Sequence, residues 1–310
     1  MRFRPTLLVM LGLTFSTVSA QAQTPAPTPP AEASKSIFNT NADRFESGRL
    51  LLTGGVSNIE GAGGGGLATW ALITGYGTRD SIGVNIHGTY VRLSDYDLLS
   101  EGFSIGFYNR VEVSYAHQDF NTLKIGALLG VGRGFTFSQE ILGVKLRVLG
   151  DTVYDQDTWL PQIAIGAQAK FSNKDTIVRA VGARASQGVD LYVAATKLFL
   201  AQSLLVDATL RLTRANETGI IGFGGPRNNG YQPQFEGSIA YLLTKDIAIG
   251  MEYRTKQSNL AFTKETDWKD IFIAWAPTKN VSVTLAYVDL GTIATRKNQR
   301  GVYLSAQFGF

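Results

Sequence analysis

The chain contains 310 residues, of which 44% are hydrophobic and 17% are charged, and it contains no cysteine. A chain without cysteine has no disulfide framework and no thiolate metal site, so stability must come from the sheet itself. The net charge of +4 comes from 29 basic and 25 acidic residues that are interspersed, which argues against nucleic-acid binding. The 34 glycines, 12 tyrosines and 17 phenylalanines, without helical periodicity, indicate an all-β chain.

The first residues have the pattern of a secretory signal peptide. Arg2 and Arg4 form a basic start, residues 7–18 form an apolar core, and Ala20-Gln21-Ala22 supplies a small-x-small cleavage site. No later segment has the roughly 18 uninterrupted apolar residues of a membrane helix. We therefore predict an exported protein with three regions, which are a signal peptide at 1–22, a Pro/Ala-rich disordered leader at 23–47 and one domain at 48–310.

The last ten residues, 301–310, alternate strictly between two kinds of side chain. Val302, Leu304, Ala306, Phe308 and Phe310 are apolar, whereas the odd positions are small or polar, so the two sets lie on opposite faces of one strand. A tilted strand of this length can cross a bilayer, and the aromatic end is typical of the closing strand of an outer-membrane barrel. The last strand of a soluble sandwich would alternate in the same way.

Other segments favour the barrel over the sandwich. Apolar and polar residues alternate as cleanly in four other segments, which are 142–148, 162–171, 203–213 and 246–256. Short connections also alternate with long ones along the chain, as in outer-membrane barrels. The connection at 150–157 is longer than this scheme expects. With a first strand near 49–54, the sequence predicts a closed antiparallel transmembrane β-barrel of about fourteen strands, with twelve to sixteen compatible. Aromatic residues near strand ends could form interfacial girdles, namely Phe235, Tyr241, Tyr253 and Trp275.

Several stretches resemble a known family. They are residues 50–80, 133–145, 155–166, 195–225 and 274–291. Together they resemble the proteobacterial domain-of-unknown-function 3034 family of exported outer-membrane proteins. The resemblance implies the compartment, the bacterial outer membrane, and no activity or site residue.

The sequence contains only weak matches to motifs for cofactor binding, metal binding or catalysis. Gly61, Gly63 and Gly66 fit a G-x-G-x-x-G pattern, but a strand-like segment follows instead of a helix, so we expect a close backbone approach and no cofactor. The two histidines, His87 and His117, make no plausible metal site. We expect no enzyme, and an outer-membrane hydrolase is a distant third hypothesis.

The faces opposite the apolar ones carry charged side chains, which we expect to line the lumen. These candidates are Glu112, Lys145, Arg147, Lys170, Lys197, Asp207, Arg211, Glu236, Glu252, Arg254 and Asp270. Such a face fits either a channel lining or a lattice of cross-strand ion pairs. We favour a passive channel for small solutes with a partly occluded lumen. The alternative is a plugged structural or interaction barrel that works through its outer loops.

Two further expectations concern assembly and occlusion. Phe308 and Phe310 are candidate insertion signals, and the expected partners are outer-membrane lipid, the barrel-assembly machinery and small solutes, with no nucleic acid. Residues 121–133 fall in an outer-loop position but include Leu123, Ile125 and Leu128, which make them too apolar for an exposed loop. We predict that this segment folds into the barrel and narrows the path.

Overall fold

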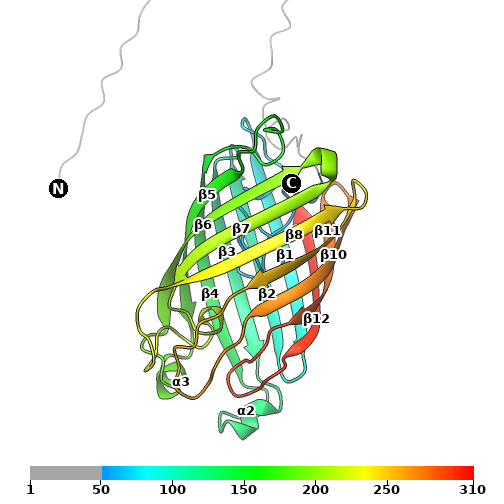
Figure 1. Cartoon of the computed structure of the whole chain (residues 1–310). Coiled ribbons are helices and arrows are strands. Elements are labelled where there is room, and N and C mark those ends of the chain that lie inside the picture. Colours follow the sequence, from blue (N-terminus) through cyan, green and yellow to red (C-terminus); the bar gives the residue numbers. More distant parts are fainter. Residues whose placement is uncertain (1–50) are drawn as a thin grey trace, which may run out of the picture. The chain divides into compact units, whose positions relative to one another are not determined.

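A computed structural model describes residues 51–310 (Figure 1). The signal peptide predicted at 1–22 and the leader predicted at 23–47 lie outside the described residues. Within residues 51–310, no helix is long and apolar enough to cross a membrane.

The described chain forms a closed antiparallel barrel of twelve strands, in which β1 pairs with β12 and every other strand pairs with its neighbours in sequence. The prediction of about fourteen strands is therefore too high by two. The strands are β1 (Ile82–Leu93), β2 (Asp97–Phe107), β3 (Val111–Asn121), β4 (Thr136–Leu149), β5 (Gln162–Ser172), β6 (Gln187–Phe199), β7 (Leu204–Thr213), β8 (Gln232–Leu242), β9 (Ile247–Arg254), β10 (Trp268–Thr278), β11 (Val281–Asp289) and β12 (Arg300–Gly309).

Strand β12 shows why these segments fold as predicted. Val302, Leu304 and Phe308 are about half exposed on the outside of the barrel, whereas Tyr303 and Gln307 are buried inside it. Because side chains alternate between the two faces, one face can be apolar and the other polar along the whole strand. The alternating segments at 142–148 and 162–171 lie within β4 and β5, and those at 203–213 and 246–256 contain β7 and β9.

The two ends of the barrel differ in their connections (Figure 1). The turn end carries short connections at 108–110, 200–203, 243–246 and 279–280, together with the longer one at 150–161. The loop end carries the helices α2 (Ile125–Leu128) and α3 (Asp175–Ala180), the short helix η2 (Glu217–Gly219) and the long connections at 122–135, 173–186, 214–231, 255–267 and 290–299. The short helix η1 (Leu200–Gln202) forms the β6–β7 turn.

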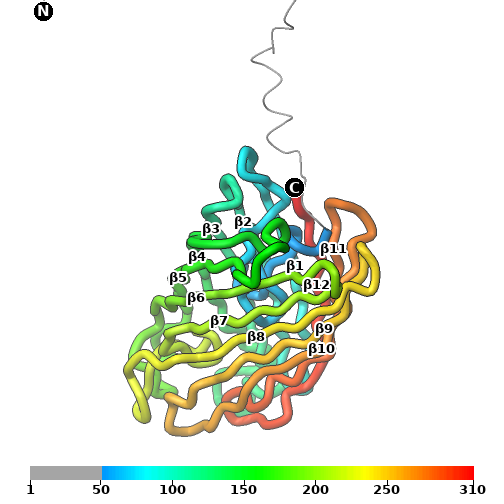
Figure 2. Tube along the Cα trace, turned by 45° about the horizontal axis from the view of Figure 1, so that its top comes forward, coloured from blue at the N-terminus to red at the C-terminus, as the bar shows by residue number. Residues whose placement is uncertain are grey.

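Residues 51–81, which we call the plug, lie inside the barrel except for Arg79 and Asp80, which are exposed just before β1 (Figure 2). Leu52 packs at the turn end against Ala248, Ala274 and Ala276. The segment then reaches Glu60 near the loop end and returns to Tyr76, whose backbone N–H bonds to the carbonyl of Phe310 at 2.9 Å. The described part of the predicted strand near 49–54, residues 51–54, and the strand-like segment at 70–76 are therefore not part of the wall, which accounts for the difference of two strands.

The prediction that residues 121–133 fold into the barrel is wrong. They form the end of β3 and most of the β3–β4 loop with helix α2, where Leu128 is 75% exposed and only Ile125 and Gly126 of the helix are buried. The plug fills the interior instead.

Candidate functional site

Carboxylates of the barrel wall hold the plug by its backbone. Glu112 accepts hydrogen bonds from the N–H groups of Gly63 and Thr74, both at 2.9 Å. Glu236 accepts from Thr69 N–H at 2.8 Å, and Glu252 accepts from Leu67 N–H at 2.6 Å. Backbone N–H groups buried away from water need such partners, so these carboxylates satisfy a segment that has no regular structure of its own.

The glycines of the plug permit this close approach. A Cβ atom at Gly63 would lie 2.8 Å from a carboxylate oxygen of Glu112, and one at Gly65 would overlap the carboxylate of Glu252. Gly61 adopts a φ of +87°, which favours glycine. The G-x-G-x-x-G pattern thus lies in the plug, and no helix follows it between residues 67 and 81.

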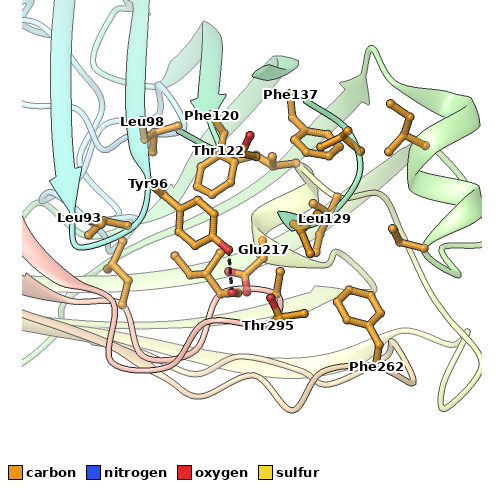
Figure 3. A pocket seen from close by; sticks show the side chains of 18 of the residues that line it. Leu93, Tyr96, Leu98, Phe120, Thr122, Leu129, Phe137, Glu217, Phe262 and Thr295 are labelled. Carbon is orange, nitrogen blue, oxygen red and sulfur yellow. Dashed lines mark hydrogen bonds between the residues drawn. The ribbon is translucent and has the colours of Figure 1, made fainter. Parts of the chain in front are cut away.

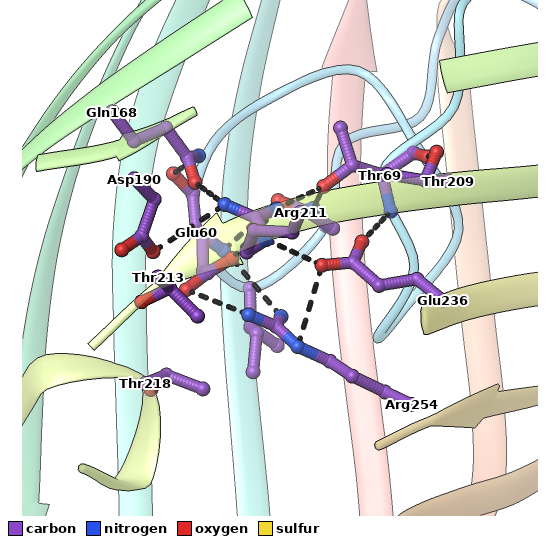
Figure 4. A network of polar contacts seen from close by, with 12 residues as sticks. Glu60, Thr69, Gln168, Asp190, Thr209, Arg211, Thr213, Thr218, Glu236 and Arg254 are labelled. Atoms are coloured by element: carbon purple, nitrogen blue, oxygen red, sulfur yellow. Dashed lines mark hydrogen bonds and ion pairs between the residues drawn. The ribbon is translucent and has the colours of Figure 1, made fainter. Parts of the chain in front are cut away.

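Three cations of the wall surround Glu60 of the plug, and Figure 4 shows two of them, Arg211 and Arg254. Lys170 binds it closely, Arg254 bonds to it at 3.0 Å, and Arg211 lies 3.5 Å from it. Arg211 also pairs with Glu236 at 2.5 Å. All five side chains are at most 2% exposed. Because buried charges must be paired, removing one member leaves the others uncompensated.

The eleven predicted interior residues are all buried, none more than 6% exposed. Glu112 and Lys145 form a pair at 3.2 Å, and Lys145 also donates to the plug carbonyls of Gly63 and Leu72. Arg211, Glu236 and Arg254 meet around Glu60. Two predicted residues lie apart, at the turn end, where Arg147 pairs with Asp151 at 2.7 Å and Lys197 binds the carbonyls of Asp155 and Leu160.

Sequence reasoning missed two members of the charge cluster, Glu60 and Asp190. Asp190 lies on the interior face of β6 and pairs with Lys170 at 2.7 Å. Its place in an alternating strand was the available signal, whereas Glu60 lies in an irregular segment with no periodicity to reveal its direction.

The two histidines do not meet. His87 is buried on β1, and His117 bonds to Glu140 at 2.7 Å on the outer face of β3. Ser114, on the same strand as His117, faces the interior, so the two side chains point to opposite sides of the wall.

A pocket of about 370 Å³ opens at the loop end, and we call it the mouth pocket (Figure 3). Its lining is apolar except for a few groups and includes Leu93, Tyr96, Leu98, Phe120, Leu129, Phe137, Val181, Glu217, Ile220, Phe262, Trp268 and Ile293. Many of these residues pack in one cluster with Ile59 and Leu67 of the plug. The plug therefore separates the mouth pocket from the turn end.

An acidic pair with one lysine borders the mouth pocket. Lys256 lies 2.7 Å from Glu217 and 3.7 Å from Glu265, and all three side chains are buried. Burial, followed by the charge of Glu217, raises the pKa of Glu265 well above its ordinary value. Burial also raises the pKa of Glu217, although Lys256 opposes that rise. Glu265 therefore holds a proton more readily, while the closer Glu217 balances the charge of Lys256.

Glu217 and Thr218 both have a left-handed backbone, with φ of +43° and +60°. Such conformations cost roughly 1–3 kcal/mol each for residues other than glycine and persist only where the surroundings fix them. The Lys256 pair holds Glu217 in this position. One oxygen of Glu217, Oε1, has no hydrogen-bond partner among the described residues.

Residues 53–307 match the family described as "Protein of unknown function (DUF3034)". The chain belongs to the DUF3034 family. This confirms the resemblance seen in the sequence. No curated protein matches the chain in sequence.

Solved structures with a similar barrel share little sequence with this DUF3034 protein. The NanC porin is 13% identical with a TM-score of 0.46, and the match covers 73% of this chain and 98% of that chain. The KdgM porin is 13% identical with a TM-score of 0.47, covering 73% and 99%. The outer membrane phospholipase A from Escherichia coli is 12% identical with a TM-score of 0.43, covering 76% and 94%.

Proposed function

We propose that this protein is an outer-membrane barrel that passes small solutes when its plug rearranges. The outside of the wall supports the membrane location, because its exposed side chains are apolar along the strands, among them Ile86, Phe103, Val113, Leu142, Leu210, Ile239, Ile271, Leu285 and Leu304. Trp275 and Tyr241 lie near the turn end and Tyr253 and Phe235 near the loop end, each 41–51% exposed. Two aromatic girdles around an apolar band are typical of barrels in lipid.

In this proposal the turn end faces the periplasm and the loop end faces outward. Phe308 and Phe310, both about half exposed on the outer face of the closing strand, would serve as the signal read by the barrel-assembly machinery. Outer-membrane lipid would contact the apolar band.

The observation that carries the transport role is the chemistry of the interior. A twelve-strand barrel lies between those filled by their own side chains and those with wide aqueous channels, so its interior needs either water or an inserted segment. Here charged side chains of the wall bind the plug through hydrogen bonds to its backbone and through ion pairs, beside apolar clusters that also join the two. Water can replace such contacts when the plug moves, whereas an apolar interior would resist wetting. The plug is thus the gate in this proposal, and the charges on the wall line the path behind it.

One observation favours the alternative, a permanently plugged barrel that works through its loops. The eleven interior charges are at most 6% exposed, and seven of them contact the plug through hydrogen bonds or ion pairs. A plug that never moves would leave the mouth pocket as the working surface.

Conductance in a planar bilayer separates these roles, and a disulfide can fix the plug. The hydroxyls of Thr74 in the plug and Ser104 on β2 lie 2.9 Å apart, and the chain has no cysteine to interfere. We expect Thr74→Cys/Ser104→Cys to conduct when reduced and to lose most conductance when oxidised.

A matched control joins two wall strands without touching the plug. The hydroxyls of Thr89 on β1 and Ser305 on β12 lie 2.8 Å apart. Thr89→Cys/Ser305→Cys should conduct equally when oxidised and when reduced. A protein that never conducts, in any form, would favour the permanently plugged barrel.

A further inference from the structure

The mouth pocket has the features of a small-molecule site. Its volume of about 370 Å³ lies in the range of ligand pockets, and aromatic and aliphatic side chains from strands β2, β3, β4 and β10 line it. Phe120, Phe137 and Trp268 are each at most 7% exposed although they border this space. A ligand with an apolar body would therefore bury its surface against a preformed wall, which is the main favourable contribution to such binding.

Polar groups at the pocket are few, and two of their atoms, Glu217 Oε1 and Trp268 Nε1, have no hydrogen-bond partner among the described residues. The hydroxyl of Tyr96 already donates a hydrogen bond to the backbone carbonyl of Ile293 at 3.4 Å, drawn as the dashed line in Figure 3. Glu217 uses Oε2 for Lys256, while its Oε1 accepts no hydrogen bond among the described residues and its side chain is 5% exposed. A buried carboxylate oxygen without a donor costs free energy, and a ligand that supplies a donor would recover it.

The charge balance at Glu217 restricts what that donor can be. Glu217 already balances Lys256, and Glu265 favours its neutral form beside them. The described residues that line the pocket include no other acidic or basic side chain. A charged ligand would lose its hydration without a counter-charge, whereas a neutral hydroxyl would lose little.

We propose that the mouth pocket binds a small neutral hydrocarbon carrying one hydroxyl group, a phenol or a comparable alcohol. The hydrocarbon lies among Leu98, Phe120 and Phe137, and the hydroxyl donates to Oε1 of Glu217. This inference names the solute class of the channel proposed above and rests on that proposal for its role in uptake. Binding itself requires only the pocket.

The test compares two ligands that differ by the hydroxyl alone, 4-propylphenol and propylbenzene. Each is titrated calorimetrically into the full-length protein in detergent, with protein-free micelles as the blank. We expect 4-propylphenol to bind about tenfold more tightly than propylbenzene, the ratio that one hydrogen bond to a charged group supports. Equal affinities in the wild-type protein would overturn the proposal.

Two tryptophan variants then locate the site. Val181 lines the mouth pocket after α3, and Val189 lies on the outer face of β6 at 40% exposure. Val181→Trp should fill the pocket and abolish binding of both ligands, whereas Val189→Trp, with the same added bulk, should bind like wild type. Equal effects of the two tryptophans would mean that the ligands only partition into the micelle, and would overturn the proposal.

Glu217→Gln tests the hydroxyl contact. It should reduce the preference for 4-propylphenol to roughly threefold or less while propylbenzene binds as before, because a neutral acceptor makes a weaker bond. An unchanged preference would contradict the assigned contact. The two proposals fail separately: a protein that binds 4-propylphenol but conducts in no form, reduced Thr74→Cys/Ser104→Cys included, would support the pocket and contradict only the channel.

Discussion

Arg254 on β9 donates a hydrogen bond of 3.0 Å to Glu60, a residue 194 positions earlier in the chain that lies inside the barrel. The plug and the wall thus share one charge cluster, and neither could bury its part alone. Sequence separation of this size also means that the plug can dock only when strands from the second half of the barrel are in place.

Glu60→Gln tests the strength of this connection. The substitution removes the common partner of Lys170, Arg211 and Arg254, so these three buried cations keep only two carboxylates, Asp190 and Glu236, between them. We expect the free energy of plug docking to fall by about 3–5 kcal/mol. Protease cleavage within residues 51–81 should rise strongly in the folded barrel, whereas Asp175→Asn, in an exposed pair with Arg179, should leave cleavage unchanged. Equal protection in both variants would contradict the role of Glu60.

Gly65→Ala tests the close approach of the plug to the wall. The added methyl group would overlap the carboxylate of Glu252, which also holds Leu67 N–H, so the plug should seat poorly. We expect a lower melting temperature and faster cleavage of the plug, with a cost of roughly 1–3 kcal/mol for overpacking. Gly88→Ala on β1 is the matched control, since nothing lies within 4 Å of its added methyl group. If both variants have the melting temperature of the wild-type protein, the plug is not packed as described.

The alternation of apolar and polar residues predicted the strands of the barrel wall, but it did not distinguish them from the alternating segment of the plug. Trp70, Leu72 and Tyr76 alternate with smaller residues as a strand would, yet they are buried with their neighbours because the wall surrounds them on all sides. Period-2 alternation reports a two-sided environment only when one side is lipid or water. The run from Gly63 to Gly66 was the better signal, since four glycines leave no side chain to pack on either face.

The charged interior was predictable for the same reason that the wall was. Arg211 on β7 and Glu236 on β8 lie on the faces opposite the apolar side chains, so alternation alone predicts that they point inward. Glu217, Lys256 and Glu265 lie in loops or just beyond a strand end, where no period assigns a direction, and only the fold brings them together. The mouth pocket could therefore not be predicted from the sequence.

Glu265→Gln tests the pH dependence of the loop end. Because the folded pKa of Glu265 is raised by burial, its contribution to stability is complete below the ordinary value of 4.5 and is lost as pH rises through the raised value. Glutamine stays neutral, so the variant should lose less stability than wild type at alkaline pH and match it below about pH 4.5. Melting curves across this range measure the difference. Parallel curves for the two proteins would show that Glu265 does not titrate in the folded state.

Phe310 closes the barrel through its backbone as well as its side chain. Its carbonyl accepts from the N–H groups of Tyr76 and Val84, both at 2.9 Å, and its own N–H donates to Val84 O. Deleting Phe310 removes these bonds, each worth about 0.5–1.5 kcal/mol, together with the exposed ring. We expect deletion to lower the amount of heat-modifiable barrel in the outer membrane more than Phe310→Ala does. A normal amount after deletion would argue against both roles.

The central claim is that residues 51–81 occupy the interior of the barrel, and cross-linking in intact cells tests it most directly. Thr74→Cys/Ser104→Cys should form a disulfide in nearly all folded protein, because the two native hydroxyls lie 2.9 Å apart. Thr74→Cys/Phe103→Cys is the control, since Phe103 is the preceding residue of β2 and points outward, 43% exposed. Mass spectrometry of the linked peptides should find the first disulfide and not the second. The absence of the first, or equal yields of the two, would contradict a plug in the lumen.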